Sequence, residues 1–320
     1  MQTWGLTDPG NIRQQNQDSY AIVPFARDRV LMIVCDGMGG AKSGNVASSL
    51  AVEVFTGEVR RTQKAGMTPE KAAAMLRSAL ELDMASQGGE QPLDWIDILA
   101  LAAAWRGGTG VTVADTQRAA QVLRGDTPPE RLPGMAGRCF SYYRAAYGAA
   151  LGGLAGHFAI RRTDPQTGEA EWIPAYGLKA FSPSAAGYPW SHYPDFGAQR
   201  SYGYARPHLG NDILGALGTP ICAVEGGTVE ALGWNRYGGW RIGIRSDDRK
   251  RYYYYAHLRK DTPYAEGLAV GQRVQAGDVI GFMGRTGYSA QENVNNIETV
   301  HLHFGLQLIF DESQKECDSE

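Results

Sequence analysis

Four of the six histidines lie in three short motifs of the sequence, RPHLGND, YYYYAHL and VHLHFG. A catalytic zinc ion usually takes three protein ligands from imidazole nitrogens and carboxylate oxygens, and it keeps a fourth position for water. His208, Asp212 and His303 could supply such a set. His257 and His301 would then act on the metal-bound water and the developing oxyanion, as general base and electrostatic stabiliser. The residue types therefore predict a hydrolase with one catalytic zinc ion.

The spacing of these residues predicts how the chain presents them. Gly210 lies between His208 and Asp212, which favours an extended or turning segment over a helix. His301 and His303 are two residues apart, so on a strand both side chains would lie on one face. The alternative is that each histidine is a core or surface residue, which is the usual outcome for a lone histidine. Three matching motifs in one chain favour the metal site.

The composition is that of a globular protein of 320 residues, 43% apolar and 20% charged, which is long enough for two domains. The net charge of −3 argues against a nucleic-acid-binding protein, because such proteins carry an excess of Lys and Arg. MQTWGLTDPG lacks the features of a signal peptide, and Ala145–Ile160 is too short to span a bilayer. We therefore expect no nucleic-acid partner, no transmembrane segment and no export signal. Cys35, Cys139, Cys222 and Cys317 are widely scattered and are expected to be free thiols.

The pattern of expected strands and helices changes twice along the sequence, which predicts three domains and an α+β, multidomain fold class. Residues 1–85 read as strands followed by two helices, the second with an N-cap and a first-turn proline in TPE. Residues 86–155 form a helical prefix with patterns such as LDWIDILALAAAWRG. Residues 156–320 read as short strands between glycine turns, a pattern typical of a small β-sandwich or barrel. Tyr252–Tyr255 is expected to be a half-buried strand within it.

Over about residues 156–311 the chain resembles the lysostaphin-type (LytM-like) zinc endopeptidases, which cut peptide cross-bridges in bacterial peptidoglycan. The histidine motifs carry this resemblance, together with GTPICAVEGGTVEALG and VGQRVQAGDVIGFMGRTGYS, which look like the β-rich core of that family. The resemblance implies a fold of the duplicated hybrid motif type. It also implies the same division into three zinc ligands and two catalytic histidines that ligand chemistry suggests.

The resemblance further implies a mechanism and a substrate. Zinc would lower the pKa of its bound water towards about 7 and polarise the peptide carbonyl of a peptidoglycan cross-bridge. Tyr202 resembles a family tyrosine that can donate to the tetrahedral oxygen, with Tyr204 as the near alternative. His157 and His192 match no motif and are expected to be structural or surface residues. The implied location is extracytoplasmic or in the cell wall.

A second resemblance covers about residues 3–83. DPGNIRQQNQDSY and VCDGMGGAKSGNVAS are similar to the start of a metal-dependent Ser/Thr protein phosphatase of the type 2C class. In that family Asp18, Asp36 and Gly37 would stand at a Mg²⁺/Mn²⁺ pair, and Arg13 would hold the substrate phosphate. The later aspartates that complete such a site have no counterpart in the sequence. The resemblance therefore implies a truncated phosphatase-like β/α fragment with an incomplete metal site and no phosphatase activity.

Two other functions stay open at this point. One is a non-catalytic cell-wall-binding or regulatory module with a peptidase-like fold, against which the presence of all five site residues argues. The other is a Ser/Thr protein phosphatase acting through the N-terminal fragment, which the missing aspartates disfavour. Binding of stoichiometric zinc would separate the peptidase from the binding module.

Overall fold

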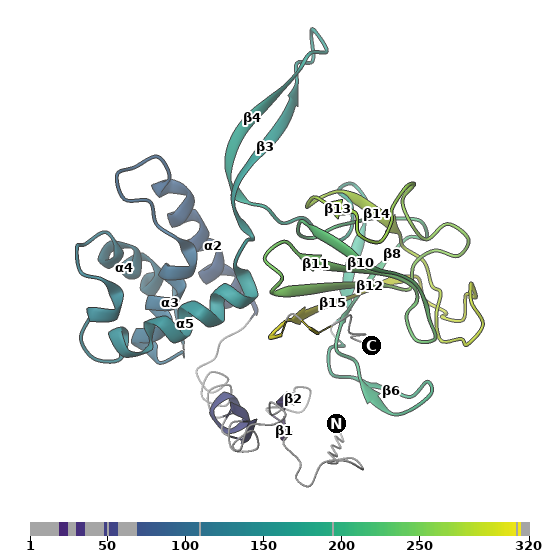
Figure 1. Cartoon of the computed structure of the whole chain (residues 1–320), viewed down its shortest axis with the longest axis horizontal. Helices are drawn as coiled ribbons and strands as arrows, with labels where there is room; N and C mark the ends of the chain where they lie inside the picture. The colour runs from purple at the N-terminus through teal and green to yellow at the C-terminus, as the bar shows by residue number, and fades with distance from the viewer. Residues whose placement is uncertain are drawn as a thin grey trace. The chain divides into compact units, whose positions relative to one another are not determined.

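A computed structural model describes residues 19–24, 30–35, 48–49, 51–56, 69–108, 110–193, 195–311 and 313–314 (Figure 1). The chain divides into two compact units, residues 1–145 and 146–320. The three-domain division expected from the sequence stays a prediction. The phosphatase-like site predicted from the sequence lies outside the described residues, since it consists of Arg13, Asp18, Asp36 and Gly37.

The first described elements of the N-terminal unit are a strand pair. β1 (Ser19–Pro24) pairs antiparallel with β2 (Val30–Cys35). Residues 48–49 and 51–56 are helical. These elements agree with the strands and the helix expected in the phosphatase-like segment.

Helices follow in the described part of this unit. α2 (Pro69–Ser86), α3 (Trp95–Arg106) and α4 (Val113–Leu123) pack against one another. α3 lies at the centre, because apolar residues occupy all of its faces and most of them are buried. A short 3-10 helix, η1 (Pro129–Arg131), precedes α5 (Met135–Leu151), whose last turns belong to the second unit.

Local sequence signals set the limits of α3 and α4. The side chain of Asp94 caps α3 by accepting a hydrogen bond from the amide two residues further on, and Gly107 ends the helix in the left-handed conformation. Thr112 and Asp115 form a capping box at the start of α4. Arg106 pairs with Asp115 at 3.0 Å, and this contact joins the end of α3 to the start of α4.

The C-terminal unit is built on a seven-stranded antiparallel sheet in the order β13-β10-β11-β12-β15-β8-β5. Its strands are β5 (Trp190–Tyr193), β8 (Asn211–Gly215), β10 (Gly227–Asn235), β11 (Gly239–Ser246), β12 (Arg251–Ala256), β13 (Arg273–Val274) and β15 (His301–Leu308). The β-rich C-terminal region within an α+β, multidomain chain is therefore confirmed.

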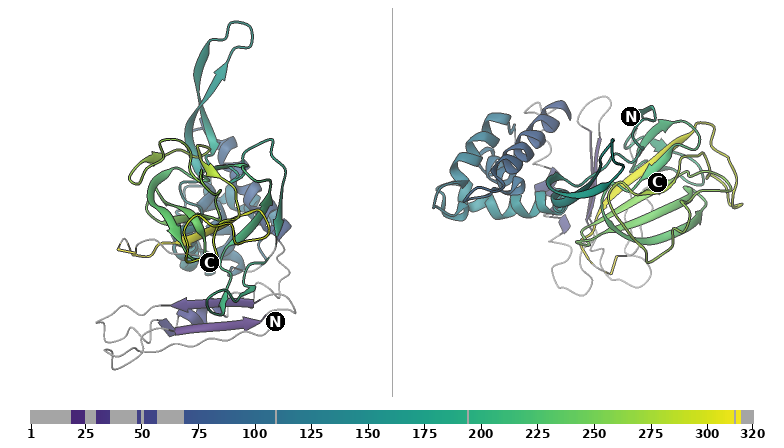
Figure 2. Two further views of the ribbon diagram at one scale, coloured as in Figure 1. Left: turned by 90° about the vertical axis from the view of Figure 1, so that its right-hand side faces the viewer. Right: turned by 90° about the horizontal axis from the view of Figure 1, so that it is seen from above.

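Further strand pairs accompany this sheet. β3 (Ala155–Thr163) and β4 (Ala170–Leu178) form a long hairpin that projects from the rest of the unit (Figures 1 and 2). The other pairs are β6 (Gln199–Arg200) with β7 (Arg206–Pro207), and β9 (Pro220–Cys222) with β14 (Val279–Phe282). β7 forms the first two residues of the first histidine motif, so the β6–β7 pair can bring side chains to the site.

The core of this unit lies on both faces of β12. Tyr253 and Tyr255 belong to the main apolar cluster, whereas Tyr252 and Tyr254 pack with Ala256 in a second cluster. All four tyrosines are at most 2% exposed. The expectation of a half-buried strand is therefore wrong, because β12 lies between β11 and β15 and is covered on both faces.

Two expectations from composition can be compared with the described residues. Cys35, Cys139 and Cys222 are free thiols, and Cys317 lies outside the described residues. Within the part of the chain that the structure describes, no helix combines the length and the apolar character that crossing a bilayer demands.

Candidate metal centre

Neighbouring strands bring the predicted site residues together. Asp212 on β8 and His303 on β15 are direct cross-strand partners, so their side chains lie on the same face of the sheet. His301 lies two residues before His303 on the same strand and faces the same way. His257 directly follows β12, the other neighbour of β15, and His208 lies three residues before β8. All five residues therefore meet at one place.

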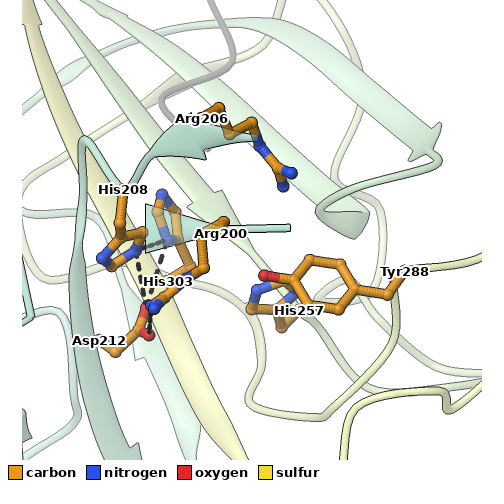
Figure 3. Close-up of a pocket in the computed structure, with 7 residues that line it drawn as sticks. All are labelled: Arg200, Arg206, His208, Asp212, His257, Tyr288 and His303. Atoms are coloured by element: carbon orange, nitrogen blue, oxygen red, sulfur yellow. Dashed lines mark hydrogen bonds and ion pairs between the residues drawn. The ribbon is translucent and has the colours of Figure 1, made fainter. Parts of the chain in front are cut away.

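The three predicted ligands point toward a common centre (Figure 3). Nε2 of His208 lies 2.7 Å from Nδ1 of His303, and Oδ1 of Asp212 lies 3.2 Å and 3.3 Å from these two nitrogens. Zinc bonds of about 2.0–2.1 Å place the ligand atoms of a tetrahedral site about 3.3–3.4 Å apart. Both distances to the carboxylate match this spacing. Opening the distance between the imidazoles by about 0.6 Å completes the triangle, so the three groups fit a zinc ion.

Burial and hydrogen bonding favour the metal-binding states of two of the predicted ligands, His303 and Asp212. The exposed fractions of all three ligands are 2% for His208, 7% for Asp212 and 1% for His303. Burial lowers the pKa of His303 to about 4, which keeps its ring neutral at pH 7. Burial alone would raise the pKa of Asp212, but hydrogen bonds with His208 and His303 hold it well below its ordinary value. Metal binding requires such a neutral imidazole and such an ionised carboxylate.

His257 and His301 lie beside the ligands, with ring centroids 4.6 Å apart. Nδ1 of His257 donates to the carbonyl of Thr286, and Nδ1 of His301 donates to the carbonyl of Thr299, both at 2.9 Å. A carbonyl only accepts, so Nε2 is the acceptor atom of each neutral ring. Burial and the neighbouring His301 and His303 lower the pKa of His257 well below its usual value. Both rings are therefore oriented to accept a proton at Nε2.

A pocket opens at this centre, and residues missed by the sequence analysis contribute to it. Its lining consists of Arg200, Arg206, His208, Asp212, His257, Tyr288 and His303 (Figure 3). Arg200 and Arg206 are cross-strand partners in the β6–β7 pair. Two arginines within eight residues of the first ligand were a weak signal that the sequence did contain. Nothing in the sequence distinguished Tyr288 from the other tyrosines.

The predicted tyrosine Tyr202 is not among the described residues that line this pocket. Its ring stacks on Tyr288 with centroids 5.0 Å apart, and its carbonyl accepts a hydrogen bond from Arg206. Tyr204 is 58% exposed and contacts Tyr237 edge-on. The catalytic role of Tyr202 stays a prediction, whereas Tyr288 is the tyrosine that reaches the pocket.

The two histidines outside the motifs do not join the cluster of described metal-ligand residues. His157 is exposed on the β3–β4 hairpin and packs edge-on against Tyr176. His192 is exposed on β5, where its Nε2 lies 2.6 Å from Oδ1 of Asn211. Both are surface residues, in agreement with the expectation from sequence.

Comparison with known families agrees with this geometry. Residues 206–316 match Peptidase family M23, and residues 12–117 match Protein phosphatase 2C. The C-terminal part of the chain therefore belongs to peptidase family M23, a family of metallopeptidases, and its N-terminal part is a phosphatase-like fragment. The second match extends past the residues that carry the resemblance in the sequence, into α4.

Individual relatives cover both parts of the chain. L-Ala–D-Glu endopeptidase of Bacillus subtilis (strain 168) is 41% identical over 117 residues, which are 37% of this chain and 34% of that protein. The solved catalytic domain of lysostaphin from Staphylococcus simulans is 36% identical and covers 33% of this chain and 72% of that chain, with a TM-score of 0.27. Serine/threonine phosphatase stp of Listeria monocytogenes is 35% identical over 75 residues, which are 23% of this chain and 29% of that protein. The chain spans about a third of the length of these two curated relatives.

Proposed function

We propose that this protein is a zinc metallopeptidase that hydrolyses peptide bonds of bacterial peptidoglycan. The observation that carries this proposal is the convergence of donor atoms from His208, Asp212 and His303 on one point, with His257 and His301 beside it. Membership of residues 206–316 in peptidase family M23 supports it. One relative is named for the bond between L-Ala and D-Glu, so that bond is a first substrate to test. An extracytoplasmic or cell-wall location follows from the proposed substrate.

Each residue around the centre has a separate role in the proposed hydrolysis. A bound zinc ion supplies a Lewis acid for the peptide carbonyl and a water molecule with a lowered pKa. Nε2 of His257 or His301 accepts a proton from the attacking water and later returns it to the leaving amine. The hydroxyl of Tyr288, in the same pocket, donates to the carbonyl oxygen as negative charge develops on it. Two closely spaced imidazoles whose Nδ1 atoms both donate to carbonyls suit this role, because either Nε2 can take up the proton.

Digestion of purified peptidoglycan by the full chain, with products identified by mass spectrometry, tests the proposal. We expect cleavage that stops with a chelator and returns with zinc. His303→Ala should abolish it, because one of three ligands is lost. His157→Ala is the matched control and should cleave like the wild type, since His157 is exposed on the hairpin.

Two outcomes would contradict the proposal. Full activity of His303→Ala protein would show that the metal centre does not perform the reaction. Zinc-loaded protein that binds peptidoglycan and releases no peptide product would favour a non-catalytic cell-wall-binding or regulatory module.

The absence of phosphatase activity in the N-terminal fragment stays a prediction. Incubation with p-nitrophenyl phosphate and manganese tests it, and we expect no release of p-nitrophenol. Release that is lost in Asp36→Ala protein would show that the fragment carries a working phosphatase site.

A further inference from the structure

Asp195 and Arg200 connect two of the proposed zinc ligands through a closed ring of contacts. Nη2 of Arg200 donates to Oδ2 of Asp212 at 2.9 Å and also to Oδ2 of Asp195. Nδ1 of His208 donates to the backbone carbonyl of Asp195 and lies 3.3 Å from its Oδ1. Since Nε2 of His208 lies 3.2 Å from Oδ1 of Asp212, the four residues form a ring. Two members of this ring are ligands and two are not.

The ring is buried, so its charges depend on one another. Asp195 is 7% exposed, and the Arg200 side chain is 22% exposed. A buried carboxylate is costly unless a cation or hydrogen-bond donors face it. Arg200 faces Asp195 and Asp212 with a single nitrogen and is their shared cation. Removal of this arginine would leave two buried carboxylates close to each other.

The backbone holds the same segment against the first ligand. The amide of His208 donates to the carbonyl of Ala198 at 2.8 Å, and the amide of Gly197 donates to the carbonyl of His208 at 2.6 Å. Arg200 follows on β6, whose partner β7 ends at the residue before His208. The segment from Asp195 to Arg200 is therefore positioned by His208 through main-chain and side-chain contacts.

We propose that Asp195 and Arg200 are positioning residues for the metal centre. Arg200 engages Oδ2 of Asp212, which directs Oδ1 toward the cation and fixes the rotation of the carboxylate. Asp195 holds the proton of His208 on Nδ1, so Nε2 presents its lone pair to the same point. Such contacts orient metal ligands, and an acceptor on Nδ1 also raises the basicity of the ligating imidazole. The inference rests on the proposed zinc site and not on the identity of the substrate.

Zinc affinity measured by competition with a chromophoric chelator tests the inference on the full chain. Arg200→Gln should bind zinc about 10–100-fold more weakly than the wild type. Asp195→Asn keeps the backbone carbonyl that accepts from His208 but removes the negative charge that anchors Arg200, so it should also bind zinc more weakly. Arg273→Gln is the matched control, because it breaks an exposed ion pair with Asp247. Its zinc affinity should equal that of the wild type. Thermal unfolding of the metal-free proteins identifies any variant that has lost its fold.

A double variant shows whether the two residues act through one ring. The combined Asp195→Asn and Arg200→Gln protein should lose less affinity than the product of the two single losses, because either change already opens the ring. Multiplicative losses would overturn the shared role. Wild-type affinity in both folded single variants would overturn the inference altogether.

The spectrum of the cobalt(II)-substituted protein gives a readout that a purely structural role would not change. Loss of Arg200 releases Oδ2 of Asp212 for the cation, so Arg200→Gln should raise the coordination number and lower the visible absorbance. A wild-type spectrum in folded Arg200→Gln protein would contradict this. None of these measurements depends on hydrolysis. Wild-type protein that binds zinc but does not cut peptidoglycan would therefore contradict the proposed function and leave the positioning role intact.

Discussion

Gly210 lies between two proposed ligands and directly against the third. A Cβ atom at this position would lie 2.2 Å from Cε1 and 2.3 Å from Nε2 of His303. Carbon atoms in favourable contact are about 3.5–4.0 Å apart. Gly210→Ala therefore requires the His303 ring or the segment around Gly210 to move by more than about 1 Å. Gly210 is not among the residues with positive φ, so alanine adds a clash without backbone strain.

The size of this displacement sets the expected effect on zinc binding. Zinc–ligand distances in a sound site lie within about 0.2 Å of their usual values. A shift of about 1 Å removes Nδ1 of His303 from bonding range, and three ligands become two. We expect zinc affinity to fall by at least about 100-fold, which corresponds to about 2.8 kcal/mol.

Chelator competition measures this loss, and Gly148→Ala is the matched control. A Cβ atom at Gly148 in α5 would meet nothing within 4 Å. This variant should bind zinc like the wild type, with a gain of up to about 1 kcal/mol in the free energy of unfolding from helix propensity. Wild-type zinc affinity in Gly210→Ala protein would refute the reasoning, because it would show that the site does not depend on the close approach of His303.

Three further predictions concern the pocket and the two units. Tyr288→Phe should lower kcat by about 100–1,000-fold without changing zinc affinity, as measured by steady-state kinetics and zinc titration. Burial opposes ionisation of Asp115, but contacts that include Arg106 lower its pKa overall. The ionised carboxylate therefore stabilises α4 above about pH 4, and this stabilisation is lost as the pH falls further. Amide hydrogen exchange at the start of α4 should rise below about pH 4 in the wild type. The rise should be smaller in Asp115→Ala protein. Glu225→Gln removes the negative charge that binds the fully buried Arg251 in a bidentate contact, while Asp248 still faces the guanidinium, and it should lower the free energy of unfolding in urea by about 1.5–3 kcal/mol.

Each of these predictions has a control within the chain. Tyr202→Phe should lower kcat less than Tyr288→Phe, since Tyr202 does not line the described pocket, and equal losses would contradict the role of Tyr288. Glu171→Gln removes the exposed partner of Arg162 and should cost less than about 1 kcal/mol. A similar cost in both glutamate variants would contradict the importance of burial. If amide exchange at the start of α4 depends on pH in Asp115→Ala protein as it does in the wild type, a group other than Asp115 causes the loss of stability at low pH.

Short-range signals made the helices and the ligand pairs predictable. An acidic N-cap and a following glycine stop mark α3, and both act within a few residues of the helix they limit. The alternation of His301 and His303 along one strand depends only on the period of two. The meeting of Asp212 with His303 depends instead on the pairing of β8 with β15, which joins residues far apart in the chain. Only ligand chemistry suggested that contact before the strand order was known.

Long-range packing also explains what the sequence analysis missed in the core. A strand with one face open to solvent would expose two of its four tyrosines, whereas both faces of β12 are covered and all four are buried. The sequence of β12 contains no information on which segments cover its second face. Burial of Tyr252 and Tyr254 therefore follows from long-range packing and not from local composition.

The proposed ligands could be predicted from the sequence, whereas the residues proposed to orient them could not. Few side chains can bind zinc, so the types and spacing of His208, Asp212 and His303 narrowly restrict the possible sites. Any donor or acceptor within reach can orient a ligand, and charged residues such as Asp195 and Arg200 are common in loops. Their role depends on a hairpin that ends at the first ligand and on burial that makes the ion pairs strong. A chain that kept its histidine motifs but lost the loop from Asp195 to Arg200 would therefore keep its ligands without the geometry that tight zinc binding needs.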